Sequence, residues 1–268
     1  MILMFGDIHG NFDHILPAVL KEKPAAIIFL GDIQAQRPLE IELEKVMDLT
    51  EIYWIHGNHD SETNAEYENL FNSKLADKNL SGKVTEIDGL RVAGLGGVFR
   101  EKSWYPKFNA YEQPKFISYK ALIDSEMQTE KWKRLRELKK LGQAPDDLPD
   151  PHLIGMALTH KSTIFYNEWV ELFEKTADIL VTHEAPTCHP HGFAGIDVLA
   201  QGIGVKKLFH GHHHDRLDYS EQFDRLKFDA YGVGFCGITD MSGKCIGAGK
   251  YDNKRIDRLN NEAVNYDS

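Results

Sequence analysis

The chain has little cysteine, with three scattered residues among 268. So few thiols, at no regular spacing, exclude a disulfide-stapled scaffold and indicate reduced cysteines in the cytoplasm. It also lacks any apolar run of the roughly 20 residues that span a bilayer, and no basic signal region precedes the strand-like start. We therefore expect a cytoplasmic protein without a membrane partner.

The chain also has no excess of basic over acidic residues. Lys and Arg number 31 against 41 Asp and Glu, which gives a net charge of −10. This balance argues against loose binding to nucleic acid, which needs a basic stripe, although a local basic patch is compatible with it. Histidine is abundant instead: seven of the 13 lie between His183 and His214, a crowding that indicates metal or proton chemistry.

Short apolar runs alternate with helical patterns in the first part of the chain. Ile2–Phe5, Ala26–Leu30 and Ile52–Ile55 have the composition of buried strands, and Phe12–Glu22 and Leu39–Leu49 have helical spacing. This βαβαβ order predicts parallel strands joined by crossover helices. Further strands are predicted at Val84–Ile87, Leu90–Leu95, Ile179–Val181 and Val205–Phe209, and short closing strands around Arg225–Phe228, Gly232–Phe235 and Cys245–Lys250.

The alternation breaks between about residues 99 and 151. This stretch contains a charged helical run, Glu130–Leu141, and ends in the Pro- and Asp-rich segment Ala144–Pro151. We interpret it as a cap-like insertion in a single domain, residues 1–252, followed by a surface tail, residues 253–268. The charged helix is expected to be a solvated face with Trp132 packed inward, and the alternative is a basic lip that recruits an anionic substrate.

Polar blocks follow the predicted strands, where open α/β sheets place their sites. Together they supply Asp, Asn and His side chains without a thiolate, which is a ligand set for two transition-metal ions held side by side. Asp and Asn after a strand often serve only turns and caps, so the ordered set rather than any single residue carries the argument. The blocks are Gly6–Gly10, Gly31–Asp32, Gly57–Asp60, Val181–Glu184 and Gly211–His214.

The ligand types also restrict the metal and the substrate. Asp32 can bridge two ions with its two oxygens, and the pair His212 and His214 would share one face of a strand while His213 points away. Only two of the seven candidate ligands are negative, so the loaded pocket is cationic and suits a phosphate. The candidates are Asp7, His9, Asp32, Asn58, His183, His212 and His214.

The order of these blocks resembles that of the calcineurin-like metallophosphoesterase superfamily, from Asp7 to His214. The resemblance implies an α/β fold of the α+β type, in which two packed mixed β-sheets are flanked by helices in a four-layer sandwich. It implies a first ion held by Asp7, His9, Asp32 and His214. The second ion would be held by Asp32, Asn58, His183 and His212.

The resemblance further implies a hydrolase of phosphate mono- or diesters that uses two divalent ions. Manganese is the ion expected first, with iron, zinc or nickel as alternatives. A metal-bridging hydroxide would attack phosphorus, and His59 would stabilise the transition state or protonate the leaving oxygen. Asp60 would accept a hydrogen bond from His59 and raise its basicity.

Two departures from relatives narrow the class. Phosphoprotein phosphatases carry arginines that clamp the phosphate, one after Gly-Asp and one before Gly-Asn-His. In this chain the residues after Asp32 are Ile-Gln-Ala-Gln-Arg-Pro, and the residue before Gly-Asn-His is His56. Arg37 and Arg100 are candidate substitutes. The sequence therefore favours the broader bacterial-type phosphoesterases, with a nuclease or cyclic-nucleotide phosphodiesterase as the alternative. A non-catalytic scaffold of the same fold is disfavoured by the intact ligand set, and the natural substrate and oligomeric state stay open.

The remaining histidines have simpler interpretations. His56 and His160 are expected to be satisfied or surface residues rather than ligands. The segment Cys188–His191 resembles a metal motif, but its side chains are too bunched for a structural zinc site. We expect it to form a loop wall of the active-site cleft.

Overall fold

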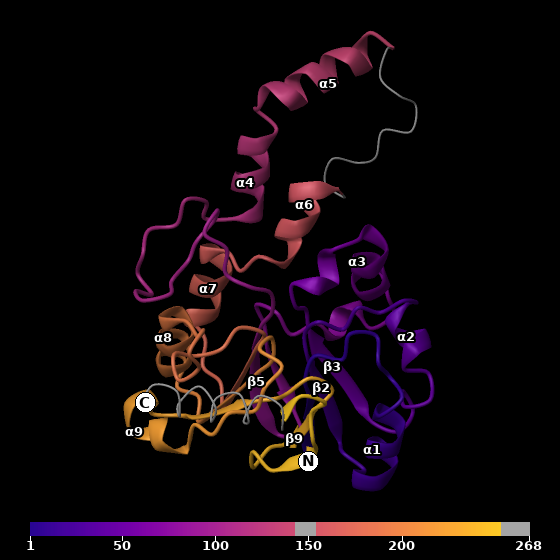
Figure 1. Ribbon diagram of the computed structural model, residues 1–268, viewed down its shortest axis with the longest axis vertical. Coiled ribbons are helices and arrows are strands. Elements are labelled where there is room, and N and C mark those ends of the chain that lie inside the picture. Colours follow the sequence, from indigo (N-terminus) through magenta and orange to yellow (C-terminus); the bar gives the residue numbers. More distant parts are fainter. Residues whose placement is uncertain (143–153, 253–268) are drawn as a thin grey trace, which may run out of the picture.

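The computed structural model describes residues 1–142 and 154–252 of the chain, arranged around two five-stranded sheets (Figure 1). The predicted segment Ala144–Pro151 and the tail 253–268 lie outside the described residues. The first sheet has the order β10 (Cys245–Gly247), β9 (Ile238–Asp240), β1 (Ile2–Phe5), β2 (Ala26–Leu30), β3 (Glu51–Ile55). The second has the order β4 (Val84–Ile87), β5 (Leu90–Leu95), β6 (Ile179–Thr182), β7 (Lys207–His210), β8 (Asp229–Gly232).

Both sheets are mixed, which confirms the fold class predicted from the resemblance. Strands β1, β2 and β3 are parallel, and β9 pairs antiparallel with β1. In the second sheet β4 forms an antiparallel hairpin with β5, and β5 to β8 run parallel. Because parallel strands end at the same edge of a sheet, the loops after β1, β2, β3, β6 and β7 are the ones that can meet.

The packing follows from the alternation of side chains along each strand. On β1, Ile2 and Met4 are buried between the sheets together with residues of the second sheet such as Val181. Leu3 and Phe5 of the same strand face the opposite way, into a cluster under the helices. Both faces of the first sheet are therefore buried, which explains why its strands are continuous apolar runs.

Helices cover the outer face of each sheet (Figure 1). The N-terminal helices α1 (Ile15–Glu22), α2 (Leu39–Glu42) and α3 (Asn64–Phe71) lie beside the first sheet. Helices α7 (Tyr166–Phe173), α8 (Ala194–Gly202) and α9 (Phe223–Leu226) lie beside the second. The result is a helix–sheet–sheet–helix sandwich. No helix among the described residues has the length and apolar character needed to cross a membrane.

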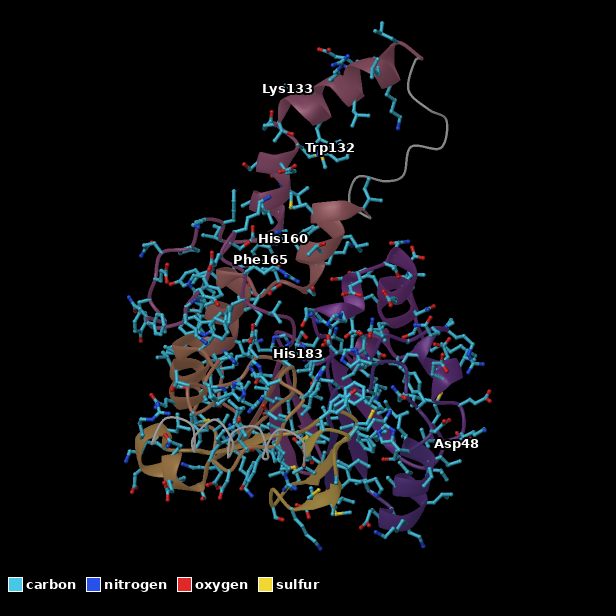
Figure 2. All side chains as sticks on the ribbon, viewed as in Figure 1. Asp48, Trp132, Lys133, His160, Phe165 and His183 are labelled. Carbon is cyan, nitrogen blue, oxygen red and sulfur yellow. The ribbon has the colours of Figure 1, made fainter. Side chains whose placement is uncertain are left out.

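Part of the predicted insertion projects from the sandwich. Helices α4 (Tyr119–Glu126) and α5 (Glu130–Lys140) extend outward, and α6 (Gly155–Thr159) returns the chain to the body (Figure 1). Trp132 and Lys133 on α5 lie far from His183 at the centre of the molecule (Figure 2). Trp132 is partly buried and Lys133 is exposed. This arrangement agrees with a solvated helix and not with a basic lip beside the site.

Three predictions of local structure were wrong. Helix α1 begins at Ile15 rather than Phe12, which places Pro17 in the first turn, where its missing N–H costs no hydrogen bond. The predicted helix Leu39–Leu49 contains only α2, followed by turns. The predicted strand Arg225–Phe228 begins inside α9, which ends at Leu226 and is followed by Lys227 in a left-handed conformation.

Of the other closing strands, Cys245–Lys250 begins where β10 begins, whereas Gly232–Phe235 was misplaced. Strand β8 ends at Gly232, so most of the predicted strand Gly232–Phe235 is a loop. Strand β9 was missed because it has only three residues, too few to show a pattern of alternation.

Candidate metal centre

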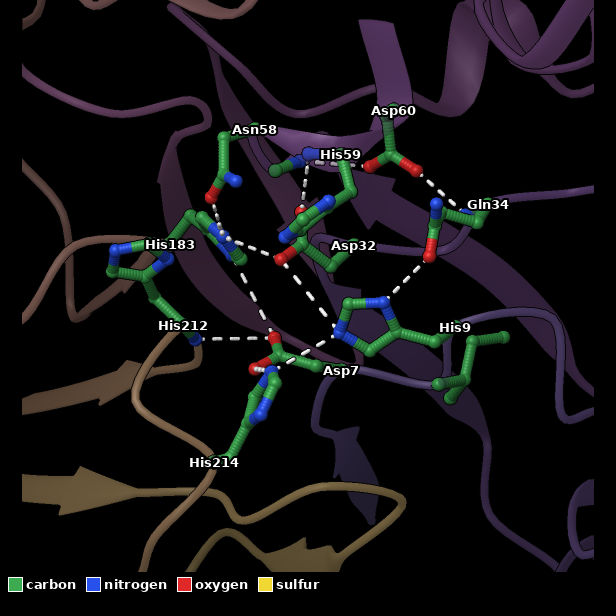
Figure 3. A network of polar contacts seen from close by, with 12 residues as sticks. Asp7, His9, Asp32, Gln34, Asn58, His59, Asp60, His183, His212 and His214 are labelled. Atoms are coloured by element: carbon green, nitrogen blue, oxygen red, sulfur yellow. Dashed lines mark hydrogen bonds and ion pairs between the residues drawn. The ribbon is translucent and has the colours of Figure 1, made fainter. Parts of the chain in front are cut away.

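The loops at the carboxyl edges of both sheets bring the predicted ligands together (Figure 3). One group has ligand atoms that all lie within 4.8 Å of one another and consists of Asp7, His9, Asp32 and His214. A second group meets the same limit and consists of Asp32, His183 and His212. Asp32 belongs to both groups, as expected for a residue that bridges two ions.

Asn58 joins the second group. Its Oδ1 atom lies 3.3 Å from Nε2 of His183, which is itself 3.3 Å from Oδ2 of Asp32. The structure thus brings all seven predicted ligands into one place, from five separate loops. Among residues 1–142 and 154–252, no other group of Asp, Glu, His or Cys meets the same limit, so Cys188–His191 forms no separate site.

Glycines before the ligands allow this close approach. A Cβ atom on Gly57 would lie 2.1 Å from Oδ1 of Asp32 and 2.6 Å from Cε1 of His183. A Cβ atom on Gly211 would lie 2.4 Å from Oδ1 of Asp7. The Gly-Asn-His and Gly-His-His-His blocks therefore require glycine because any side chain there would occupy the space of the carboxylates.

Four of the ligands have a left-handed backbone, which is uncommon outside glycine. The φ angles are 42° at His9, 47° at Asp32, 69° at His212 and 60° at His214. The prediction that His212 and His214 alternate along a strand is wrong, because β7 ends at His210 and the loop turns both residues toward Asp7 and Asp32. Strained positions of this kind cluster at functional sites.

Hydrogen bonds outside the cluster fix two imidazoles. Nδ1 of His183 donates to the Leu30 carbonyl at 2.7 Å, and Nδ1 of His9 donates to Oε1 of Gln34 at 2.6 Å. In each ring Nε2 then carries the lone pair that faces the cluster. Nε2 of His9 lies 3.0 Å from Nε2 of His214.

The carboxylates complete the test of whether cations fit here. Asp7 and Asp32 are fully buried, and the Oδ2 atom of each accepts no hydrogen bond. Buried polar atoms normally have a partner, because an unsatisfied one costs about 1–3 kcal/mol. Histidine lone pairs that point inward, next to carboxylate oxygens without a hydrogen-bond partner, are the ligands that divalent transition-metal ions bind. The residues present therefore fit such ions.

Without a metal, the cluster holds protons in place of cations. Burial, assisted by the charge of Asp32, raises the pKa of Asp7 to about 8. Burial opposes the charge on His183, but Asp32 and Asp7 overcome it and raise its pKa to about 10. Burial likewise opposes ionisation of Asp32, yet the nearby charge of His183 holds its pKa below the usual range.

The prediction that Asp60 accepts a hydrogen bond from His59 is wrong. Oδ1 of Asp60 accepts from the Gln34 amide at 2.7 Å and Oδ2 from the Gly57 amide at 2.8 Å, so this buried carboxylate joins two loops. Nδ1 of His59 instead lies 2.6 Å from Oε1 of Glu62. His59 opens a 3₁₀ turn, in which side chains three residues apart are aligned and adjacent ones diverge.

Two residues around the ligands were not predicted from the sequence. Glu62 had a signal in its spacing of three from His59, whereas Gln34 had none beyond a polar residue after a strand. The two candidate arginines differ in their exposure and their contacts. Arg37 is exposed and pairs with Glu42 at 2.8 Å, whereas Arg100 is half-buried and lines a hollow beside Asn58.

The other histidines are mostly as predicted. His56 contacts Oγ of Ser81 at 3.2 Å, and His160 contacts Oγ1 of Thr163 at 2.9 Å, so both are satisfied. His213 does not point outward, because its ring stacks on His189 with centroids 3.8 Å apart. His191 lines the same hollow as Arg100, so the loop is a wall of the site.

The fold and the paired Asp/His groups define a two-sheet sandwich with a candidate dinuclear metal centre at its edge. A family model described as calcineurin-like phosphoesterase matches residues 1–216, and this chain belongs to that family. The chain is 35% identical over 246 residues to a Haemophilus influenzae protein described as uncharacterized, covering 92% of this chain and 96% of that one. The crystal structure of TT1561 from Thermus thermophilus has a similar fold, with a TM-score of 0.51 at 14% identity, covering 92% of this chain and 97% of that one.

Proposed function

We propose that the protein is a metal-dependent hydrolase of phosphate mono- or diesters. The observation that carries the proposal is the pair of ligand groups that share the buried carboxylate of Asp32. Family membership supports it, because the family is that of calcineurin-like phosphoesterases. Manganese is the ion proposed first, since the oxygen and nitrogen ligands suit it, and iron, zinc or nickel are the alternatives.

The residues of the site would have different roles. Two divalent ions would supply Lewis-acid charge for the phosphoryl oxygens and promote ionisation of water. Asp7, His9, Asp32 and His214 would hold one ion, and Asp32, Asn58, His183 and His212 the other. Leu30 and Gln34 keep the rings of His183 and His9 in the ligating tautomer.

His59 is the proposed proton donor to the leaving oxygen. Its ring is adjacent to that of His9, with centroids 5.2 Å apart, and its side chain is about a third exposed at the mouth of the cluster. Because Nδ1 is held by Glu62, Nε2 is the nitrogen that remains for the substrate. Its backbone N–H donates to Oδ1 of Asp32 at 2.8 Å, which ties the position of His59 to the ligand set.

Replacing His59 tests the assignment. In the manganese-loaded protein, His59→Ala should lower kcat for phenyl phosphate, whose leaving oxygen is strongly basic, by about 100-fold or more, the usual contribution of a positioned acid–base group, and should lower kcat for p-nitrophenyl phosphate by less. Metal content should stay unchanged, because His59 is not a ligand. Full turnover in this variant would remove His59 from the mechanism. Comparing mono- and diesters with manganese, zinc, iron and nickel would then define the substrate class.

A further inference from the structure

A hollow of about 400 Å³ lies to one side of the second ligand group. Asn58 and His212 of that group line it, but Asp7, His9 and His214 of the first group do not. A phosphate bound by both ions would have to reach both ligand groups, and of the first group no residue lines the hollow. The hollow is therefore next to the place of reaction and can receive another part of the substrate.

Two cations face this hollow, Arg100 and Lys107. Both come from the segment after β5, at the start of the predicted insertion. Within the described part of the chain, neither lies within ion-pair distance of a carboxylate. Glu184 also lines the hollow, but it is buried and its Oε1 accepts from the Phe99 amide at 3.1 Å.

Arg100 has more N–H donors than its two hydrogen bonds use. Its Nε donates to Oγ1 of Thr163 at 3.1 Å and its Nη2 to Oγ of Ser162 at 3.3 Å. Both partners are neutral, and a guanidinium has five N–H groups. Burial lowers the pKa of Arg100 even though the charge of Glu184 opposes this shift, and a bound anion would further stabilise the guanidinium.

Aromatic side chains set the position of the second cation. Nζ of Lys107 lies 4.6 Å from the centroid of the Phe193 ring, and Tyr105 packs edge-on against the same ring with centroids 5.1 Å apart. Lys107 is thereby held over one wall of the hollow by its contact with the ring face. Arg100 and Lys107 outnumber the one carboxylate in the lining, that of Glu184, and in a chain of net charge −10 this local excess of positive charge favours an anion.

We propose that Arg100 and Lys107 bind a second anionic group of the substrate, a carboxylate or phosphate carried on the same small molecule as the reacting phosphate. The substrate class is then small phosphate esters with two anionic groups. This inference rests on the proposed function and names its substrate class. It also assigns the start of the insertion to substrate selection.

The test compares two non-hydrolysable ligands that differ in the second anion. Phosphonoacetate carries a carboxylate beside its phosphonate, and ethylphosphonate does not. Isothermal titration of the manganese-loaded wild type should show phosphonoacetate binding about tenfold or more tightly, as expected for one or two charge-assisted contacts. Lys107→Met should reduce that affinity ratio about tenfold, and Arg100→Lys should reduce it as well, since a Lys lacks the planar fork.

The matched control is Lys102→Met, in the same segment but outside the hollow. It should leave the ratio unchanged. Equal affinities for both ligands in the wild type, or an unchanged ratio in Lys107→Met, would overturn the inference while leaving the proposed function intact. If neither phosphonate binds and p-nitrophenyl phosphate is not hydrolysed with any of the four metals, the proposed function fails and this inference fails with it.

Discussion

At the scale of single residues, the contact between His59 and Glu62 changes the expected proton relay. A proton donor matters most when the leaving oxygen is strongly basic, and little when it is p-nitrophenolate. Glu62→Gln, which removes the charge that orients His59, should therefore lower kcat for phenyl phosphate about tenfold more than for p-nitrophenyl phosphate. Steady-state kinetics on the two substrates measures this difference.

The matched control for that prediction is Glu68→Gln. Glu68 is exposed on α3, six residues after Glu62. It should alter neither rate. An equal loss on both substrates in Glu62→Gln would show that Glu62 supports the turn but does not orient the proton donor.

The ligands were predictable from sequence, and their supporting residues were not. Asp7, Asp32 and His183 are unusual residues directly after apolar strands, so their types and order are visible in the chain. The contacts of Gln34 and Glu62 depend on the left-handed backbone at Gln34 and on a 3₁₀ turn at His59. Such backbone geometry is set by tertiary packing and leaves little trace in local composition.

At the scale of elements, Asp60 is the link between the loops after β2 and β3. Its two oxygens accept from the amides of Gln34 and Gly57. An amide side chain offers only one acceptor oxygen there, so Asp60→Asn should leave a buried N–H without a partner. We expect a loss of about 2 kcal/mol in the free energy of unfolding, measured with urea in EDTA.

Asp48→Asn is the control for Asp60→Asn. Asp48 is exposed at the periphery of the sandwich (Figure 2). It should change the free energy of unfolding by less than about 0.5 kcal/mol. Equal stability of the Asp60→Asn and wild-type proteins would mean that the two loops are held by other contacts.

The reliability of the predicted elements followed the length and clarity of their sequence patterns. Strands β1, β2, β4 and β5 were predicted with their observed bounds, because each is an apolar run or a clear hairpin. Helices α2 and α9, with four residues each, and strand β9, with three, are too short for periodicity to define them. The pairing of the strands into two sheets came from the family resemblance, since alternating strands and helices also fit a single doubly wound sheet.

At the scale of the whole molecule, metal binding and stability should be linked through pH. In the metal-free protein the pKa of Asp7 is raised to about 8 and that of His183 to about 10. Between pH 7 and pH 8 the folded state therefore binds more protons than the unfolded chain, and stability falls as pH rises. Each such proton contributes a slope on the order of 1 kcal/mol per pH unit.

Urea unfolding across pH 7 to 8 checks the sign. With EDTA present, the free energy of unfolding should decrease as pH rises, and saturating manganese should abolish the decrease because the ions replace those protons. His56 and His210, whose pKa values are lowered to about 4, weakly oppose this trend near pH 7, because part of each is still protonated in the unfolded chain at its ordinary pKa of about 6.5. A metal-free protein that gains stability from pH 7 to pH 8 would contradict the account.

Metal analysis of the wild type and two variants tests the central claim, that Asp32 joins two ion sites. After metal-replete purification the wild type should contain about two equivalents of transition metal per chain. Asp32→Asn, which weakens both groups at once, should lose both equivalents, whereas His183→Ala should retain about one because the group of Asp7, His9, Asp32 and His214 stays intact. A wild type that binds no transition metal, or an Asp32→Asn protein that keeps two equivalents, would contradict it.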